Sequence, residues 1–159
     1  MRKLFLLTTF QCFLLTGTVA LCQSTNHIAR HNQKFFSSYS QYKFEQIIAK
    51  LRDVKYVTSR QVGWGRAPGE FHKLSKEAMT FGTAIDFASL LEDENPVIRV
   101  MGLVGLAQTK LGNYTNLLKS RLGDEAEVNV MLGCGGHKAT VGEIAKWLVG
   151  DPKFFDREF

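Results

Sequence analysis

The sequence predicts an all-α protein, built as a short array of stacked helix pairs with a slight superhelical bend. Apolar residues recur at helical spacing, one later segment is apolar on almost every side, and residues 90–105 resemble residues 121–136. A helix pair cannot bury its apolar face alone, so neighbouring pairs would stack into one core. We therefore expect a single helical domain over residues 41–159, with an N-terminal helix and one irregular Gly-rich loop.

The N-terminus has the three-part layout of a secretory signal peptide. A positively charged head of three residues precedes Leu4–Leu21, which carries no charge, and small and polar residues follow. We expect residues 1–22 to be removed, after Ala20 or Cys22, and the chain to be exported to the periplasm or the extracellular space. Two alternatives stay open. Leu4–Leu21 could remain as an uncleaved helix, although 18 residues are short for a membrane span, or Cys22 could carry a lipid anchor.

Charge and cysteine content exclude two classes of protein. Removal of Arg2 and Lys3 leaves 18 of the 20 basic residues against 15 acidic ones, a net charge near +3. These charges are scattered, which argues against a nucleic-acid-binding tract. Cys134 is the one cysteine beyond the targeting region, so no disulfide framework is expected and the core must hold the fold.

Residues 23–40 are polar without a clear period and are predicted to be a flexible lead-in. They contain His27 and His31, whose spacing could hold a metal on a helix. No acidic residue or cysteine lies nearby to complete a site, so we expect no metal and no cofactor.

The first predicted helix covers residues 42–53. Phe44, Ile47, Ile48 and Leu51 form one apolar stripe, with charged residues outside it. This helix and the last residues, 151–159, are candidate caps of the array. Between the helix and the next loop, residues 55–62 are rich in β-branched side chains and could form a short extended piece.

The segment Gly63–Phe71 holds three glycines and a proline, which excludes regular structure there. It carries Trp64 and Arg66, residue types that are enriched in binding hot spots. We predict an exposed contact loop; the alternative is that Trp64 folds back onto the core as a lid.

From Thr83 the chain is predicted to be helical almost to its end. Asn95 is a candidate N-cap with Pro96 at the first helical position. The helix that follows, to Thr109, is apolar on most sides, yet it is too short and too charged for a membrane span. Burial among neighbouring helices is the better interpretation, with Gly112 as the stop signal.

An internal repeat appears at an offset of 31 residues, with six identities in 16 aligned positions. The matched pairs are Leu91 with Leu122, Asp93 with Asp124, Glu94 with Glu125, Val97 with Val128, Gly102 with Gly133, and Gly105 with Gly136. A third, partial unit is predicted where Thr140 and Glu143 form a capping box ahead of an apolar stripe.

Residues 90–108 resemble a HEAT-type repeat of the bacterial kind, in which an Asp-rich turn joins two helices. Asp93, Pro96, Val97 and Arg99 match that pattern, whereas the second copy has Glu127 and Val130 in place of the proline and the arginine. The resemblance covers residues 82–155 and implies a HEAT-like α-α superhelical array. The stretch from Ser59 to Leu74 also resembles secreted bacterial proteins to which no activity is attached.

Cys134 and His137 are the residues that most suggest chemistry. They could be a nucleophile with its base, half of a zinc site, or part of a phosphate loop. A zinc site lacks further ligands, and the segment lacks the Gly-Lys-Ser/Thr ending of a phosphate loop. The predicted function is therefore binding of another protein, not catalysis, through Trp64 and Arg66 or a concave helix surface. The alternative is a cysteine-dependent enzyme that uses Cys134 with His137.

Overall fold

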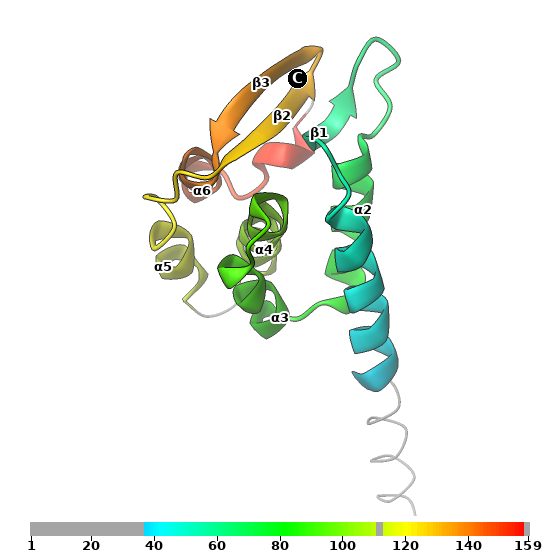
Figure 1. Ribbon diagram of the computed structural model, residues 1–159, viewed down its shortest axis with the longest axis vertical. Helices are drawn as coiled ribbons and strands as arrows, with labels where there is room; N and C mark the ends of the chain where they lie inside the picture. The colour runs from blue at the N-terminus through cyan, green and yellow to red at the C-terminus, as the bar shows by residue number, and fades with distance from the viewer. Residues whose placement is uncertain (1–36, 111–112, 158–159) are drawn as a thin grey trace, which may run out of the picture. The chain divides into compact units, whose positions relative to one another are not determined.

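A computed structural model of the chain describes residues 37–110 and 113–157, and Ser40–Phe159 form one compact unit. This unit combines helices with a three-stranded sheet (Figure 1), so the prediction of an all-α, HEAT-like array is wrong. The described elements are a helix over residues 37–51, β1 (Val57–Val62), α2 (Glu70–Phe81), α3 (Ala84–Ser89), the 3-10 turn η1 (Leu90–Glu92), α4 (Pro96–Thr109), α5 (Tyr114–Lys119), β2 (Glu127–Gly133), β3 (Gly135–Thr140), α6 (Val141–Gly150) and the 3-10 turn η2 (Phe154–Asp156).

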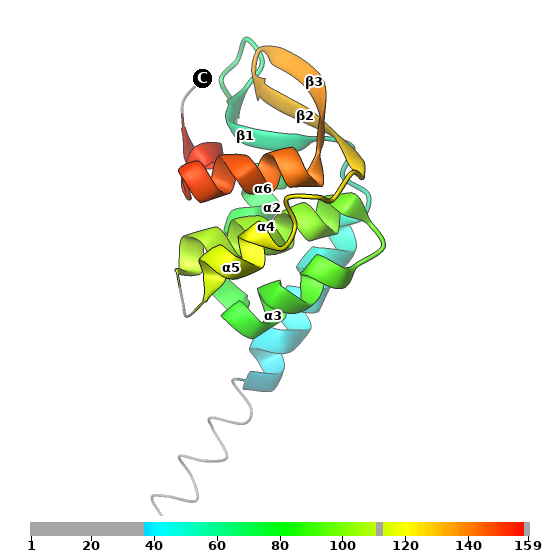
Figure 2. The same cartoon turned by 90° about the vertical axis from the view of Figure 1, so that its left-hand side faces the viewer.

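The sheet has the strand order β1-β2-β3, with β1 parallel to β2 and β2 antiparallel to β3. Figure 2 shows α6 between the sheet and helices α4 and α5. Val57, Val128 and Val130 of the sheet are buried in the same core as the helices. Because β1 and β2 are far apart in sequence, their pairing joins an early segment of this unit to a late one.

Residues 127–140, predicted to be helical, form the β2–β3 hairpin. Along β2 the exposed residues Glu127 and Asn129 alternate with the buried Val128 and Val130, which is the period of a strand and not of a helix. The strands are joined by a two-residue turn after Leu132. Gly133 has φ +56°, the conformation that a type II′ hairpin turn requires at its first central residue.

Part of the internal repeat survives as a local turn. Asp93 accepts a hydrogen bond from the backbone N–H of Asn95 at 2.9 Å, and Asp124 accepts one from that of Ala126 at 3.1 Å. The matched aspartates thus make equivalent Asx turns, but a helix follows the first and a strand follows the second. The identities at offset 31 therefore reflect turn chemistry and not a second helix pair.

The structure agrees with the helix predicted after Asn95, which is α4. Asn95 caps α4 by accepting from Val97 N–H, Pro96 is its first residue, and the helix is buried along most of its length. Gly102 and Gly105 lie directly against Phe87 of α3, where a side-chain carbon would come within 2.7 Å and 2.3 Å of it. Gly133 and Gly136, matched to them in the repeat, lie in the β2–β3 hairpin instead, so the second helix that the repeat predicted is replaced there by two strands.

Several local predictions are confirmed. The stripe of Phe44, Ile47, Ile48 and Leu51 is buried, and residues 57–62 form the extended piece as β1. Thr140 and Glu143 make the predicted capping box of α6. The helix over residues 37–51 already covers the end of the predicted lead-in. The predicted signal peptide, His27, His31 and Gly112 lie outside the described residues.

No helix within residues 37–110 and 113–157 is both long and apolar enough to cross a membrane.

Candidate functional site

The loop between β1 and α2 is closed by its own backbone. Val62 N–H donates to the Ala67 carbonyl at 3.0 Å, and Arg66 N–H donates to the Gly63 carbonyl at 3.1 Å. Gly63 has φ +68°, a left-handed conformation that suits glycine. These bonds hold Trp64 at the outer end of a defined turn, away from the core.

The same loop is tied to the turn of the β2–β3 hairpin. Gly63 N–H donates to the Gly133 carbonyl at 2.9 Å, and Gly133 N–H donates to the Ser59 hydroxyl at 3.3 Å. The two turns lie at the same end of the sheet in both views (Figures 1 and 2). Parallel pairing of β1 with β2 thus brings together segments that are some 70 residues apart.

Between the two turns lies a hollow of about 310 Å³. It is lined by Gln61, Gly63, Trp64, Arg66, Gly133 and Cys134. The structure therefore places Trp64 and Arg66, the predicted contact residues, beside Cys134, which no sequence pattern connects with them. Because Trp64 is 98 % exposed, the alternative in which it folds back onto the core is wrong.

Arg66 is held in a conformation that L-residues rarely adopt. Its φ is +47°, and Lys110, at the end of α4, is the other described non-glycine residue with positive φ. Such a conformation costs about 1 kcal/mol relative to an ordinary one. The Arg66 side chain makes no hydrogen bond or ion pair with any residue that the structure describes.

Cys134 and His137 do not act on one another in the described structure. Cys134 is exposed in the hairpin turn, while His137 lies on β3 opposite Val130. The His137 ring meets the Trp147 ring edge-on, with the ring centroids 6.1 Å apart, and Trp147 stacks on Phe154 at 5.0 Å. No hydrogen bond joins the thiol to the imidazole among the described residues, so this geometry adds no support to the nucleophile hypothesis.

Within the described ranges, no three histidine, cysteine, aspartate or glutamate side chains gather closely enough to hold a metal ion.

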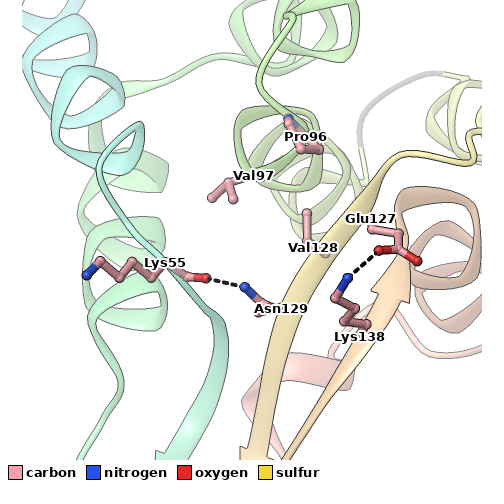
Figure 3. Close-up of a pocket in the computed structure, with 7 residues that line it drawn as sticks. All are labelled: Lys55, Pro96, Val97, Glu127, Val128, Asn129 and Lys138. Carbon is pink, nitrogen blue, oxygen red and sulfur yellow. Dashed lines mark hydrogen bonds and ion pairs between the residues drawn. The ribbon is translucent and has the colours of Figure 1, made fainter.

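A second hollow, of about 220 Å³, lies between the start of α4 and the β2–β3 hairpin (Figure 3). Two polar contacts lie in its lining: Asn129 donates to the Lys55 carbonyl at 3.4 Å, and Lys138 pairs with Glu127 at 2.7 Å. The hydrogen bond that Lys138 donates to the Glu127 carboxylate raises the pKa of Lys138. Pro96 has no N–H, and the N–H of Val97 is taken by Asn95. The start of α4 therefore offers no free donors to an anion here.

One polar cluster had no signal in the sequence. Asp156, in η2, accepts hydrogen bonds from His72 at 3.1 Å, Lys76 at 2.9 Å and Gln108 at 3.3 Å. Burial alone would raise the pKa of Asp156, but the bonds from Lys76 and His72 outweigh it and hold the pKa below its ordinary value. Since donors from α2 and α4 hold this one carboxylate, we assign the cluster to fastening the C-terminal segment onto α2 and α4.

The comparisons with known proteins identify no family. No protein-family model matches the sequence. No curated protein matches it either. Membership of a HEAT-type family therefore stays a prediction, separate from the fold, which is mixed α/β.

Proposed function

We propose that this protein is an exported binding module without catalysis, and that it contacts another protein through Trp64, Arg66 and the turn at Gly133–Cys134. The observation that carries the proposal is the exposure of Trp64, which is 98 % accessible on a loop with a fixed backbone. The hydrophobic lining of a partner would cover this side chain, which the protein's own fold leaves bare.

The magnitude of the available energy supports an interaction role. Burying an exposed tryptophan removes roughly 200 Å² from water, which at about 25 cal/mol per Å² corresponds to roughly 5 kcal/mol before the costs of association. Leaving such a residue exposed contributes nothing to folding. A single aromatic anchor of this kind can dominate the affinity of an interface.

The backbone of Arg66 supports the same surface. A glycine at position 66 would relieve the left-handed strain, so the arginine is not the residue that serves the fold best there. Strain of this kind tends to be retained at functional sites, where the side chain and its direction matter more than stability. The side chain that this conformation presents carries a charge and lies next to Trp64 in the lining of the hollow.

The alternative, a cysteine-dependent enzyme, is supported by the exposure of Cys134 at this hollow. Thiol labelling separates it from the binding module. If Cys134 in the folded protein reacts with iodoacetamide no faster than a free thiol at neutral pH, the hypothesis of a cysteine-dependent enzyme should be rejected. A markedly faster reaction would favour it.

Affinity capture from the native envelope tests the binding module. Trp64→Ala is compared with Ile85→Ala, a matched control because Ile85 is an exposed apolar residue on α3, 82 % accessible. We expect a partner that wild type and Ile85→Ala retain and that Trp64→Ala loses. Retention of the same proteins by all three would count against the loop as the contact surface.

Export is tested by mass spectrometry of the mature N-terminus. A start at Leu21 or Gln23 supports cleavage, whereas a lipid on Cys22 would make the protein a membrane-anchored one. An intact Met1 in the envelope would indicate the uncleaved helix.

A further inference from the structure

We propose that the surface of Trp64, Arg66 and the Gly133–Cys134 turn selects an acidic protein segment, one that places an Asp or Glu carboxylate on Arg66 and apolar side chains on Trp64. The inference rests on the proposed function and names the chemistry of the partner.

The charge of the hollow points to a carboxylate. Arg66 is its one charged lining residue, and no acidic side chain lines it. Elsewhere in the described structure, arginines pair with carboxylates: Arg52 with Asp93, Arg99 with Asp124, Arg121 with Glu92, and Arg157 with Asp151. The guanidinium of Arg66 has no such partner among the described residues, so its donors are available to a ligand.

The geometry of Arg66 suits a directed contact. Its backbone is fixed by the hydrogen bond to Gly63 and by the closure of the loop, so less freedom is lost when the side chain binds. A guanidinium binds a carboxylate through two parallel hydrogen bonds, which gives both strength and direction.

The backbone between Trp64 and Arg66 carries no side chain, because the residue there is Gly65. Gly65, between Trp64 and Arg66, does not have a left-handed backbone, and a side-chain carbon there would meet nothing within 4 Å. The fold therefore does not require glycine at this position. A surface without side chains allows the main chain of a partner to come close to the loop.

A protein segment fits these features better than a lipid surface or a small molecule. Basic segments that bind anionic lipid carry about 4–8 lysines and arginines, whereas this lining has one. Small-molecule pockets enclose most of their ligand. Trp64 instead projects outward, nearly fully exposed, and so fits a depression on a partner.

Selection from a display library of short random peptides tests the inference. The full chain is used as bait, with Trp64→Ala as the counter-selection, and the peptides that depend on Trp64 are sequenced. We expect enrichment of Asp and Glu among them. For a selected peptide, fluorescence polarisation should show affinity falling about tenfold with Arg66→Ala, and falling equally when its carboxylates are replaced by amides. Ile85→Ala should bind as wild type does, and Arg66→Lys should recover part of the loss.

Three results would overturn the inference in different ways. Trp64-dependent peptides that lack acidic enrichment and tolerate Arg66→Ala would overturn the choice of ligand and leave the proposed function standing. An absence of Trp64-dependent peptides would overturn the contact surface and the proposed function together.

A third result comes from a separate experiment on the Trp147→Phe variant, in which Trp64 is the remaining tryptophan. A blue shift of its emission with phosphatidylglycerol vesicles, but not with phosphatidylcholine vesicles, would assign the surface to lipid instead.

Discussion

Arg66 and Lys110 adopt the same left-handed backbone conformation in two different settings. Lys110 ends α4, where its N–H donates to the Leu106 carbonyl and a residue with positive φ is a common way to stop a helix. Arg66 lies in an exposed loop with no helix to end. The strained backbone therefore has a structural reason at Lys110, where it ends a helix. At Arg66 we explain it by the side chain that the loop exposes.

Replacement by glycine separates these two roles. We expect both Arg66→Gly and Lys110→Gly to stabilise the protein by roughly 0.5–1 kcal/mol, because glycine adopts positive φ without a steric cost. Urea unfolding followed by circular dichroism measures the change. Arg66→Gly should also weaken partner binding, whereas Lys110→Gly should leave it unchanged. A lower midpoint for Arg66→Gly would contradict the account of strain at this residue.

At the scale of elements, the contact between α3 and α4 depends on glycines that admit Phe87. A methyl group at position 105 would lie 2.3 Å from the Phe87 ring, which is closer than atoms can approach. We expect Gly105→Ala to destabilise the protein by about 1–3 kcal/mol through overpacking. Gly65→Ala is the control, since its methyl group would meet nothing. Equal thermal midpoints for the two variants would refute this packing.

The elements also show what the sequence could reveal. Helical stripes, the cap at Asn95 and the capping box at Thr140 act over a few residues, and each was predictable. The hairpin had local signals as well: polar and apolar residues alternate from Glu127, and Gly133–Cys134 is a two-residue turn that begins with glycine. The repeat at offset 31 obscured them, because matched aspartates and glycines preserve a turn without preserving the helix.

The candidate site was predictable only in part, for a physical reason. Trp64 and Arg66 could be placed in an exposed loop because glycine and proline exclude regular structure there. The position of Cys134 beside them depends on parallel pairing between β1 and β2, which no local pattern specifies. Asp156 likewise meets His72 across 84 residues of sequence, so contacts of this kind follow from the fold alone.

At the scale of the whole molecule, three aspartates fasten segments that are distant in sequence. Asp93 pairs with Arg52, Asp124 with Arg99, and Asp156 with Lys76 and His72. The hydrogen bond from Arg52 is the main cause that lowers the pKa of Asp93. For Asp124, burial is the largest single effect and would raise the pKa, but the hydrogen bonds from Arg99 and the Ala126 backbone, together with the nearby arginine charges, outweigh it, so the pKa is again lowered.

The lowered pKa values of these three aspartates predict how the free energy of unfolding changes at acidic pH. Because the pKa of each carboxyl is lower in the folded state than in the unfolded one, where it is about 3.9, the stabilisation is complete well above that value. It is lost as the pH falls through the lower, folded pKa. We expect a flat free energy of unfolding from neutral pH to about pH 5 and a decline below about pH 4. Asp156→Asn should show a shallower decline, and an identical decline would remove Asp156 from the explanation.

Hydrogen–deuterium exchange tests most directly whether this protein binds through the Trp64 surface. The free protein is compared with the protein bound to the partner that affinity capture retains. We predict slower exchange at residues 63–67 and at 133–135, the two turns that contain most of the residues lining the hollow, with α3 around Ile85 unchanged. Protection at α3 or elsewhere, with exchange at both turns unaltered, would contradict the assignment of this surface.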